Sequence, residues 1–200
     1  LDPHEIDNLA SSPDHQTILE RLRSAHMRWV TDTKDLGLIA EPILISRQSI
    51  VGNQYEILRR SEDPTLYQRV AQTALMASSG GEAIPMLTTA LDDIDAAVRY
   101  WGAVGLGNHA QNAGSAFKQL SVIMKTDPSS VCRTAAARAL CRLGHPDVAL
   151  PVLTTELKEG SQWERLHAAI VLDEIDDQAR PVITQMHAAL KPRTDLYANG

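Results

Sequence analysis

The sequence predicts an all-α fold: an α–α superhelix, or solenoid, of about four helix pairs, preceded by an N-terminal helix and a linker. Two observations predict this class. Alanine and leucine dominate the apolar residues and only 4% of the 200 residues are aromatic, a mixture that favours packed helices over sheets. In addition, an arginine followed by small and then large apolar residues recurs four times at nearly constant spacing, which is the signature of a repeat architecture.

Four arginines set the phase of the repeat, with spacings of 30, 34 and 32 residues. They are Arg69, Arg99, Arg133 and Arg165. Small residues recur three and four places after the arginines, and a large apolar residue recurs seven places after them. This spacing predicts helices with one closely packed side. The predicted repeats cover residues 63–92, 93–126, 127–159 and 160–192.

A second element lies between these stretches and carries a proline near its start. The proline is Pro85, Pro151 or Pro181, and Lys118 takes its position in the remaining copy. Proline is tolerated in the first turn of a helix, because the N–H groups there have no intrahelical acceptor. Each repeat is therefore predicted to be a pair of helices, with the proline near the start of the second helix.

Each repeat arginine is also preceded, six places earlier, by an acidic residue. The acids are Asp63, Asp93, Asp127 and Glu159. A guanidinium group can satisfy several acceptors at once, and an acid in a neighbouring turn can fix its position. We therefore predict that the four acids and four arginines form an internal structural ladder. The alternative is a basic row that binds substrate, which the four accompanying acids disfavour.

The repeated pattern resembles HEAT repeats, especially the short bacterial type, and is also typical of armadillo-type solenoids. The matching features are Val98-Arg99, Asp127-Pro128, Ala136-Ala137 and Leu143-Gly144. The resemblance implies the fold and says little about function.

The first forty residues differ from the repeats. A long amphipathic helix is predicted from about Asp14 to Thr31, followed by a linker and a helix near 46–60. The segment Asp2-Pro3-x-Glu5-x-x-Asn8-Leu9-Ala10, together with Trp29, resembles the C-terminal end of the sulfatase family. The resemblance implies that residues 1–45 are a remnant of a sulfatase C-terminal subdomain with its linker, and that 46–200 form the solenoid. Because the chain opens at Leu1 without a methionine, we expect a fragment or a processed product.

The same resemblance implies a parent enzyme that hydrolyses a sulfate ester or a sulfamate, uses calcium and formylglycine, and is periplasmic or secreted. It transfers no catalytic, metal or cofactor residue to this chain, because neither Cys132 nor Cys141 lies in the Cys/Ser-x-Pro-x-Arg motif. We therefore expect the chain itself not to be an enzyme, and expect both cysteines to be small buried residues. The main alternative is a free-standing protein-binding scaffold unrelated to sulfatases, and a third reading is an enzyme in its own right.

Charge and hydropathy exclude further classes. The net charge of -6 does not favour nucleic-acid binding, and no apolar run approaches the roughly 20 residues that a membrane-spanning helix needs. Glu164 and His167 have the spacing of a helical metal pair, but a surface helix pair is the favoured interpretation.

One surface is a candidate interface. Positions one, two and five after the repeat arginines are predicted to face the concave side of the solenoid. They are Tyr100, Trp101, Val104, Thr134, Ala135, Arg138, Leu166, His167 and Ile170. Large apolar residues predominate among them, and contiguous exposed apolar area tends to mark an interface. The predicted partners are the sulfatase catalytic domain, another protein or a second copy of the chain.

Overall fold

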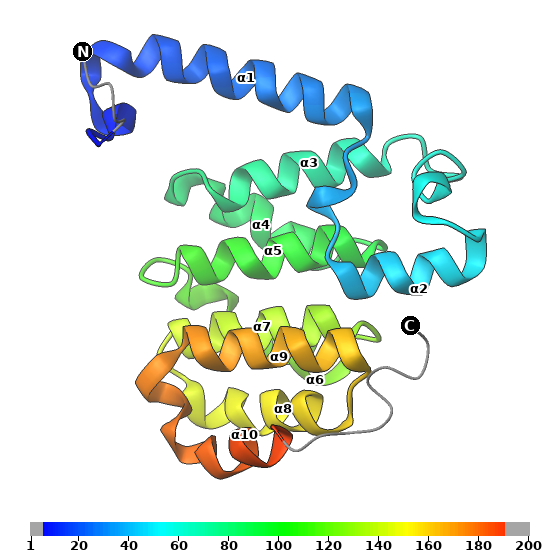
Figure 1. The fold of residues 1–200 in the computed structure, drawn as a ribbon. Coiled ribbons are helices and arrows are strands. Elements are labelled where there is room, and N and C mark those ends of the chain that lie inside the picture. The colour runs from blue at the N-terminus through cyan, green and yellow to red at the C-terminus, as the bar shows by residue number, and fades with distance from the viewer. Residues whose placement is uncertain (1–5, 191–200) are drawn as a thin grey trace. The chain divides into compact units, whose positions relative to one another are not determined.

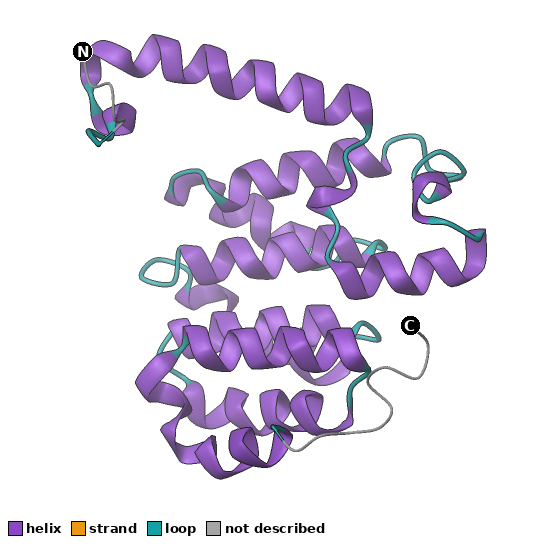
Figure 2. Ribbon diagram, in the orientation of Figure 1, coloured by secondary structure: helices purple, strands orange, loops and turns teal. Residues whose placement is uncertain are grey.

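The computed structural model describes residues 6–190 and divides the chain into two compact units, with the boundary between Leu36 and Gly37. The described residues form ten α-helices and several short 3-10 segments, and no strand occurs among them (Figures 1 and 2). The predicted all-α class is therefore confirmed.

The first unit is built around one long helix. Two 3-10 turns, Leu9–Ser11 and Pro13–His15, lead into α1 (Gln16–Thr33), close to the predicted 14–31. The first turn is capped by Asn8, whose side chain accepts a hydrogen bond from the Ala10 amide at 3.0 Å. Helix α1 ends at Lys34, whose φ of 52° is the left-handed conformation that often closes a helix.

The second unit opens with a helix that the sequence interpretation misplaced. A helix was expected near 46–60, but α2 spans Glu41–Val51 because Pro42 suits its first turn and Gly52 ends it. Gly52 has a φ of 94°, a conformation that glycine adopts without steric cost. The predicted domain boundary at 45/46 thus falls inside α2, and the assignment of 1–45 to a sulfatase remnant stays a prediction.

Four helix pairs follow, as predicted. They are α3 (Leu66–Ala77) with α4 (Ile84–Ala90), α5 (Ala96–Asn108) with α6 (Phe117–Thr126), α7 (Ser130–Arg142) with α8 (Pro146–Glu159), and α9 (Gln162–Glu174) with α10 (Ile183–Ala189). The first helices of the pairs, α3, α5, α7 and α9, lie side by side in chain order (Figure 1).

The prolines mark helix starts in two of three positions. Pro85 lies in the first turn of α4, and Pro181 lies in the 3-10 segment Asp176–Val182 directly before α10. The prediction is wrong for Pro151, which lies inside α8, because Pro146 already begins that helix five residues earlier.

The small residues of the repeat allow the helices to approach closely. Gly102 and Ala103 on α5 are buried, as are Ala136 and Ala137 on α7. A Cβ added at Gly105 would lie 2.6 Å from a Leu87 side-chain atom and 3.0 Å from the Ala77 backbone. The large apolar residues seven places after the arginines complete this core, with Leu106, Leu140 and Leu172 at most 1% exposed. The core is therefore continuous along the repeats.

Both cysteines belong to this core. Cys132 and Cys141 are buried and free, as predicted. Burial raises the pKa of the Cys132 thiol to about 12 and that of Cys141 to about 11. The thiols are therefore protonated at neutral pH and are poor nucleophiles.

Candidate interaction surfaces

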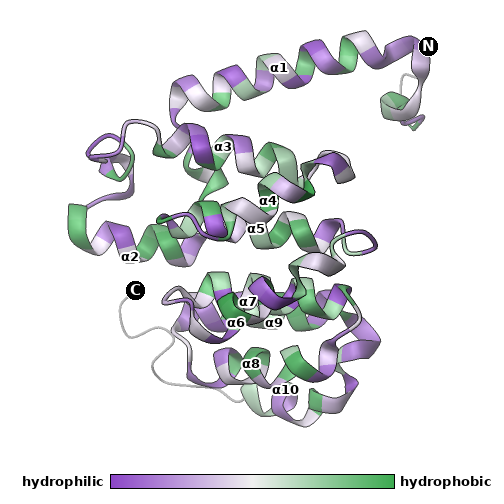
Figure 3. Cartoon of the chain, turned by 180° about the vertical axis from the view of Figure 1, so that it is seen from behind, coloured by the Kyte–Doolittle hydropathy of each residue, from purple (hydrophilic) through white to green (hydrophobic). Residues whose placement is uncertain are grey.

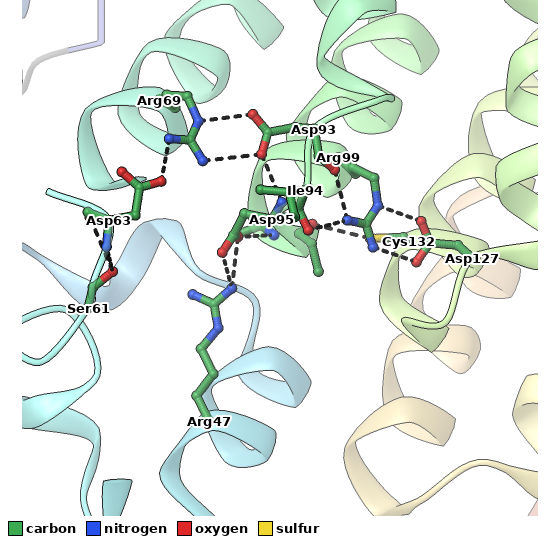
Figure 4. Close-up of polar contacts among 12 residues, drawn as sticks. Arg47, Ser61, Asp63, Arg69, Asp93, Ile94, Asp95, Arg99, Asp127 and Cys132 are labelled. Atoms are coloured by element: carbon green, nitrogen blue, oxygen red, sulfur yellow. Dashed lines mark hydrogen bonds and ion pairs between the residues drawn. The ribbon is translucent and has the colours of Figure 1, made fainter. Parts of the chain in front are cut away.

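The repeat arginines join successive repeats through carboxylates. Arg69 contacts Asp63 at 2.6 Å and also reaches Asp93 of the next repeat, with Nε 2.9 Å from Oδ2 (Figure 4). Arg99 makes a two-pronged contact with Asp127 of the next repeat, at 2.7 and 2.9 Å. The Arg99 guanidinium also donates to the backbone carbonyl of Asp93 at 2.9 Å. The ladder is thus staggered: each arginine binds mainly the acid that precedes the next arginine.

The third arginine follows the same rule with a different acid. Nε of Arg133 lies 2.6 Å from Oε1 of Glu156, one helical turn before the predicted Glu159. The second oxygen of Glu156 accepts a short hydrogen bond from the Ser130 hydroxyl. Glu156 is buried on α8, and the predicted Glu159 is exposed and pairs with Lys158 at 3.9 Å. The sequence rule missed Glu156 because it required a spacing of six residues before the next arginine.

The fourth arginine has no acid partner within residues 6–190. Arg165 donates from Nε to the carbonyl oxygen of Leu157 at 3.0 Å. Glu159 of the predicted ladder is therefore not its partner, since Arg165 satisfies a backbone acceptor instead. Within residues 6–190 the ladder consequently has three closed junctions, and the one at Arg165 has no acid.

These ion pairs shift the ionisation of their members. The hydrogen bond from Arg69 holds the pKa of Asp63 near 2, well below its ordinary value. In the next junction, the hydrogen bond to Asp127 raises the pKa of Arg99. The charged forms are therefore the stable ones at neutral pH, as expected for a structural ladder.

A second set of polar contacts links the other ends of the same helices. Arg138 on α7 binds both carboxylate oxygens of Glu174 on α9, at 2.5 and 2.6 Å. Arg142 reaches the same carboxylate at 3.0 Å, and Asn108 on α5 accepts from Arg138 at 3.4 Å. Arg138 was predicted to be part of an interface, but its guanidinium is engaged within the chain.

The segment before α3 lies against the predicted interface. Arg47 on α2 binds Asp95, the residue that caps the start of α5, at 2.7 and 2.8 Å. Nε1 of Trp101 on α5 donates a 2.7 Å hydrogen bond to the carbonyl oxygen of Leu38. The chain therefore satisfies part of this surface with its own residues 38–47.

This contact corrects the predicted apolar stripe. Tyr100, Trp101 and Val104 are only partly exposed and pack on the core, while Thr134 and Ala135 are buried at 0% and 1% exposure. The open part of the stripe reduces to Leu166 and Ile170, which are 49% and 54% exposed. Repeat packing and the segment before α3 bury the remainder. An interface role for the stripe stays a prediction.

His167 belongs to the covered part. Its ring lies 5.8 Å from that of Tyr100, and its buried Nδ1 has no hydrogen-bond partner in the described part of the chain. Burial, together with the nearby Arg138, lowers the pKa of His167. Glu164, which shares its helix, accepts from the Ser161 amide at 2.8 Å in a capping box. Glu164 therefore caps α9, and among residues 6–190 no group of three or more His, Cys, Asp or Glu could hold a metal ion.

A groove opens at the last repeat. Two adjoining pockets, of about 460 and 360 Å³, lie against α9 and α10 and share Leu157, Arg165 and Ala189. Leu190, on the larger pocket, is 81% exposed, and Ile183 is 51% exposed. Arg165 thus lies in a largely apolar groove of this repeat.

Residues 55–141 match the family model of HEAT repeats. The match covers α3 to α7, so the HEAT-repeat interpretation is confirmed for this stretch. No curated protein and no solved structure matches the chain.

The HEAT repeats indicate a role in protein interaction, and this fold is typically non-catalytic. No helix among residues 6–190 combines the length and apolar character needed to cross a bilayer. Nothing in these comparisons links the chain to a sulfatase.

Proposed function

We propose that the chain is a non-catalytic HEAT-repeat module that docks onto a neighbouring folded protein through α1. The observation that carries the proposal is the exposed apolar side of this helix. Of its 18 residues, Val30 is the only buried one. Ile18, Leu22 and Trp29 are 47%, 57% and 58% exposed.

These three side chains occupy one face of α1. They are four and seven residues apart, which places them on one side of a helix with 3.6 residues per turn. Figure 3 shows polar segments between the apolar ones along α1. Because a helix in water gains most of its stability from packing such a face, the face supports a docking role.

The proposed neighbour is a sulfatase catalytic domain. The proposal rests on the sequence resemblance described above, of which Asn8, Leu9, Ala10 and Trp29 lie in the described part, whereas Asp2, Pro3 and Glu5 lie outside it. A helix that covers a missing domain would expose its apolar side when viewed alone, as α1 does. The cofactors of such a parent, calcium and formylglycine, would belong to the catalytic domain.

The reading frame upstream of Leu1 tests the identity of the neighbour. The proposal expects Leu-Tyr-Asp directly before Leu1 and Cys/Ser-x-Pro-x-Arg several hundred residues earlier. A start codon with neither motif between it and Leu1 would rule out the sulfatase parent. The free-standing scaffold would then remain.

Calorimetry of the longer protein tests the docking face. Replacing Leu22 and Trp29 by serine should separate the unfolding of the upstream domain from that of the HEAT repeats into two transitions. The matched control replaces Arg23, an exposed residue of the same helix, by serine. A single unchanged transition in the Leu22/Trp29 variant would contradict docking through α1.

A further inference from the structure

We propose that the groove at the last repeat binds an acidic amphipathic helix of another protein, whose carboxylate completes the ladder at Arg165. This inference is independent of α1 and of the identity of the neighbouring domain, because it concerns the opposite end of the chain.

The rule of the ladder defines what is missing. Arg69, Arg99 and Arg133 each bind a carboxylate that lies 24, 28 and 23 residues further along the chain. The corresponding positions for Arg165 are 188–193, whose sequence Ala-Ala-Leu-Lys-Pro-Arg contains no acid. The sequence itself therefore supplies no carboxylate at the expected phase.

The surroundings of Arg165 have the chemistry of a binding groove. Nε of Arg165 is occupied by the Leu157 carbonyl, and its two terminal nitrogens, Nη1 and Nη2, make no hydrogen bond with residues 6–190. The larger pocket is walled by apolar side chains, among them Leu166, Leu172, Ile183, Met186 and Leu190. A cationic fork beside an apolar floor is complementary to a helix that carries one carboxylate among leucines.

An internal example shows how such a helix binds. Glu156 of α8 reaches Arg133, and the same helix buries Leu150, Leu153 and Leu157 at 5%, 0% and 5% exposure. The repeat of α9 and α10 leaves Ile183 and Leu190 exposed, which gives an incoming helix an apolar surface to bury.

The probe is a fluorescent peptide with the sequence of residues 146–160, which contains Glu156. A hydrocarbon staple between positions 155 and 159, both exposed in α8, keeps it helical, because peptides of this length are marginal helices in water. The matched control peptide carries Glu156→Gln and the same staple. Fluorescence anisotropy measures their binding to the full chain.

The proposal expects saturable binding that depends on one charge pair. Arg165→Met in the chain, or Glu156→Gln in the peptide, should each weaken binding about tenfold, the effect of losing a hydrogen-bonded charge pair. Combining the two changes should weaken it no further. Leu190→Ser should also weaken binding, whereas Arg180→Met, which removes an exposed charge from the same repeat, should not. Circular dichroism checks that each variant is folded.

Three outcomes would overturn the proposal. The first is the absence of saturable binding to the wild-type chain, and the second is equal binding of the two peptides. The third is binding that arises only after Asp195→Asn, at a position 30 residues beyond Arg165 and outside the described residues. That last result would assign the groove to a carboxylate of the chain itself rather than to a partner.

Discussion

The centre of the solenoid and its last repeat use the same sequence pattern with opposite results. At the centre, Arg99 forms an ion pair with Asp127, and the two side chains are only 11% and 1% exposed. At the repeat of α9 and α10, the one partner of Arg165 among residues 6–190 is a backbone carbonyl, beside an open apolar groove. The same arginine phase thus produces a structural junction where the described residues supply an acid, and a candidate binding site where residues 6–190 supply none.

The largest expected effect comes from breaking the central junction. Asp127→Ala should lower the free energy of unfolding by about 3–5 kcal/mol, because it leaves the half-buried Arg99 without its counter-charge. Denaturant titration followed by circular dichroism measures this loss. Glu159→Ala, which removes an exposed acid, is the control and should change stability by less than about 0.5 kcal/mol. Equal losses in the two variants would show that the junction has no special role.

A second effect tests close packing at the centre. Gly105→Ala should cost about 1–3 kcal/mol, because the new Cβ would overlap Leu87 and approach the Ala77 backbone. Gly114→Ala is the matched control, since an added Cβ there meets no atom within 4 Å. Thermal unfolding compares the two variants. A stable Gly105→Ala protein would mean that α3, α4 and α5 are less tightly packed than described.

The third effect is pH-dependent and concerns His167, the partly buried histidine of α9 that lies beside Tyr100 of α5. The pKa of His167 is lowered in the folded chain, so the unfolded chain binds the proton more readily. The contribution of the neutral ring is therefore complete above the unfolded pKa, about 6.5, and is lost as the pH falls through the lowered folded value. Melting temperatures measured from pH 7.5 to 5 should fall more in wild type than in His167→Phe. Identical pH profiles would contradict the burial of this ring.

The smallest expected effect on stability is at the open end. Arg165→Met should change the free energy of unfolding by about 0.5–1.5 kcal/mol at most, since one hydrogen bond to Leu157 is lost. Denaturant titration beside Arg99→Met measures the contrast. A loss at Arg165 as large as that at Arg99 would show that the last junction is closed after all.

How far the sequence predicted this molecule depends on the range of each interaction. The repeat phase predicted the helix pairs and the buried small residues such as Ala136, because local spacing determines which side of a helix packs. It missed Glu156 as the partner of Arg133. Residues three apart on a helix lie on the same side of it, so the sequence alone does not decide whether Glu156 or Glu159 faces the arginine. The contact of Trp101 with Leu38, 63 residues away, was also missed, because no local pattern encodes where the segment before α3 folds back.

Two double-mutant cycles test the central claim most directly. One pairs Arg99→Met with Asp127→Asn, and the other pairs Arg165→Met with Glu159→Gln, each read out as the free energy of unfolding. The staggered ladder predicts a coupling energy of about 1–3 kcal/mol in the first cycle, as for residues in direct contact, and less than about 0.5 kcal/mol in the second. Equal coupling energies in the two cycles would contradict a ladder that is closed at the centre and open at its end.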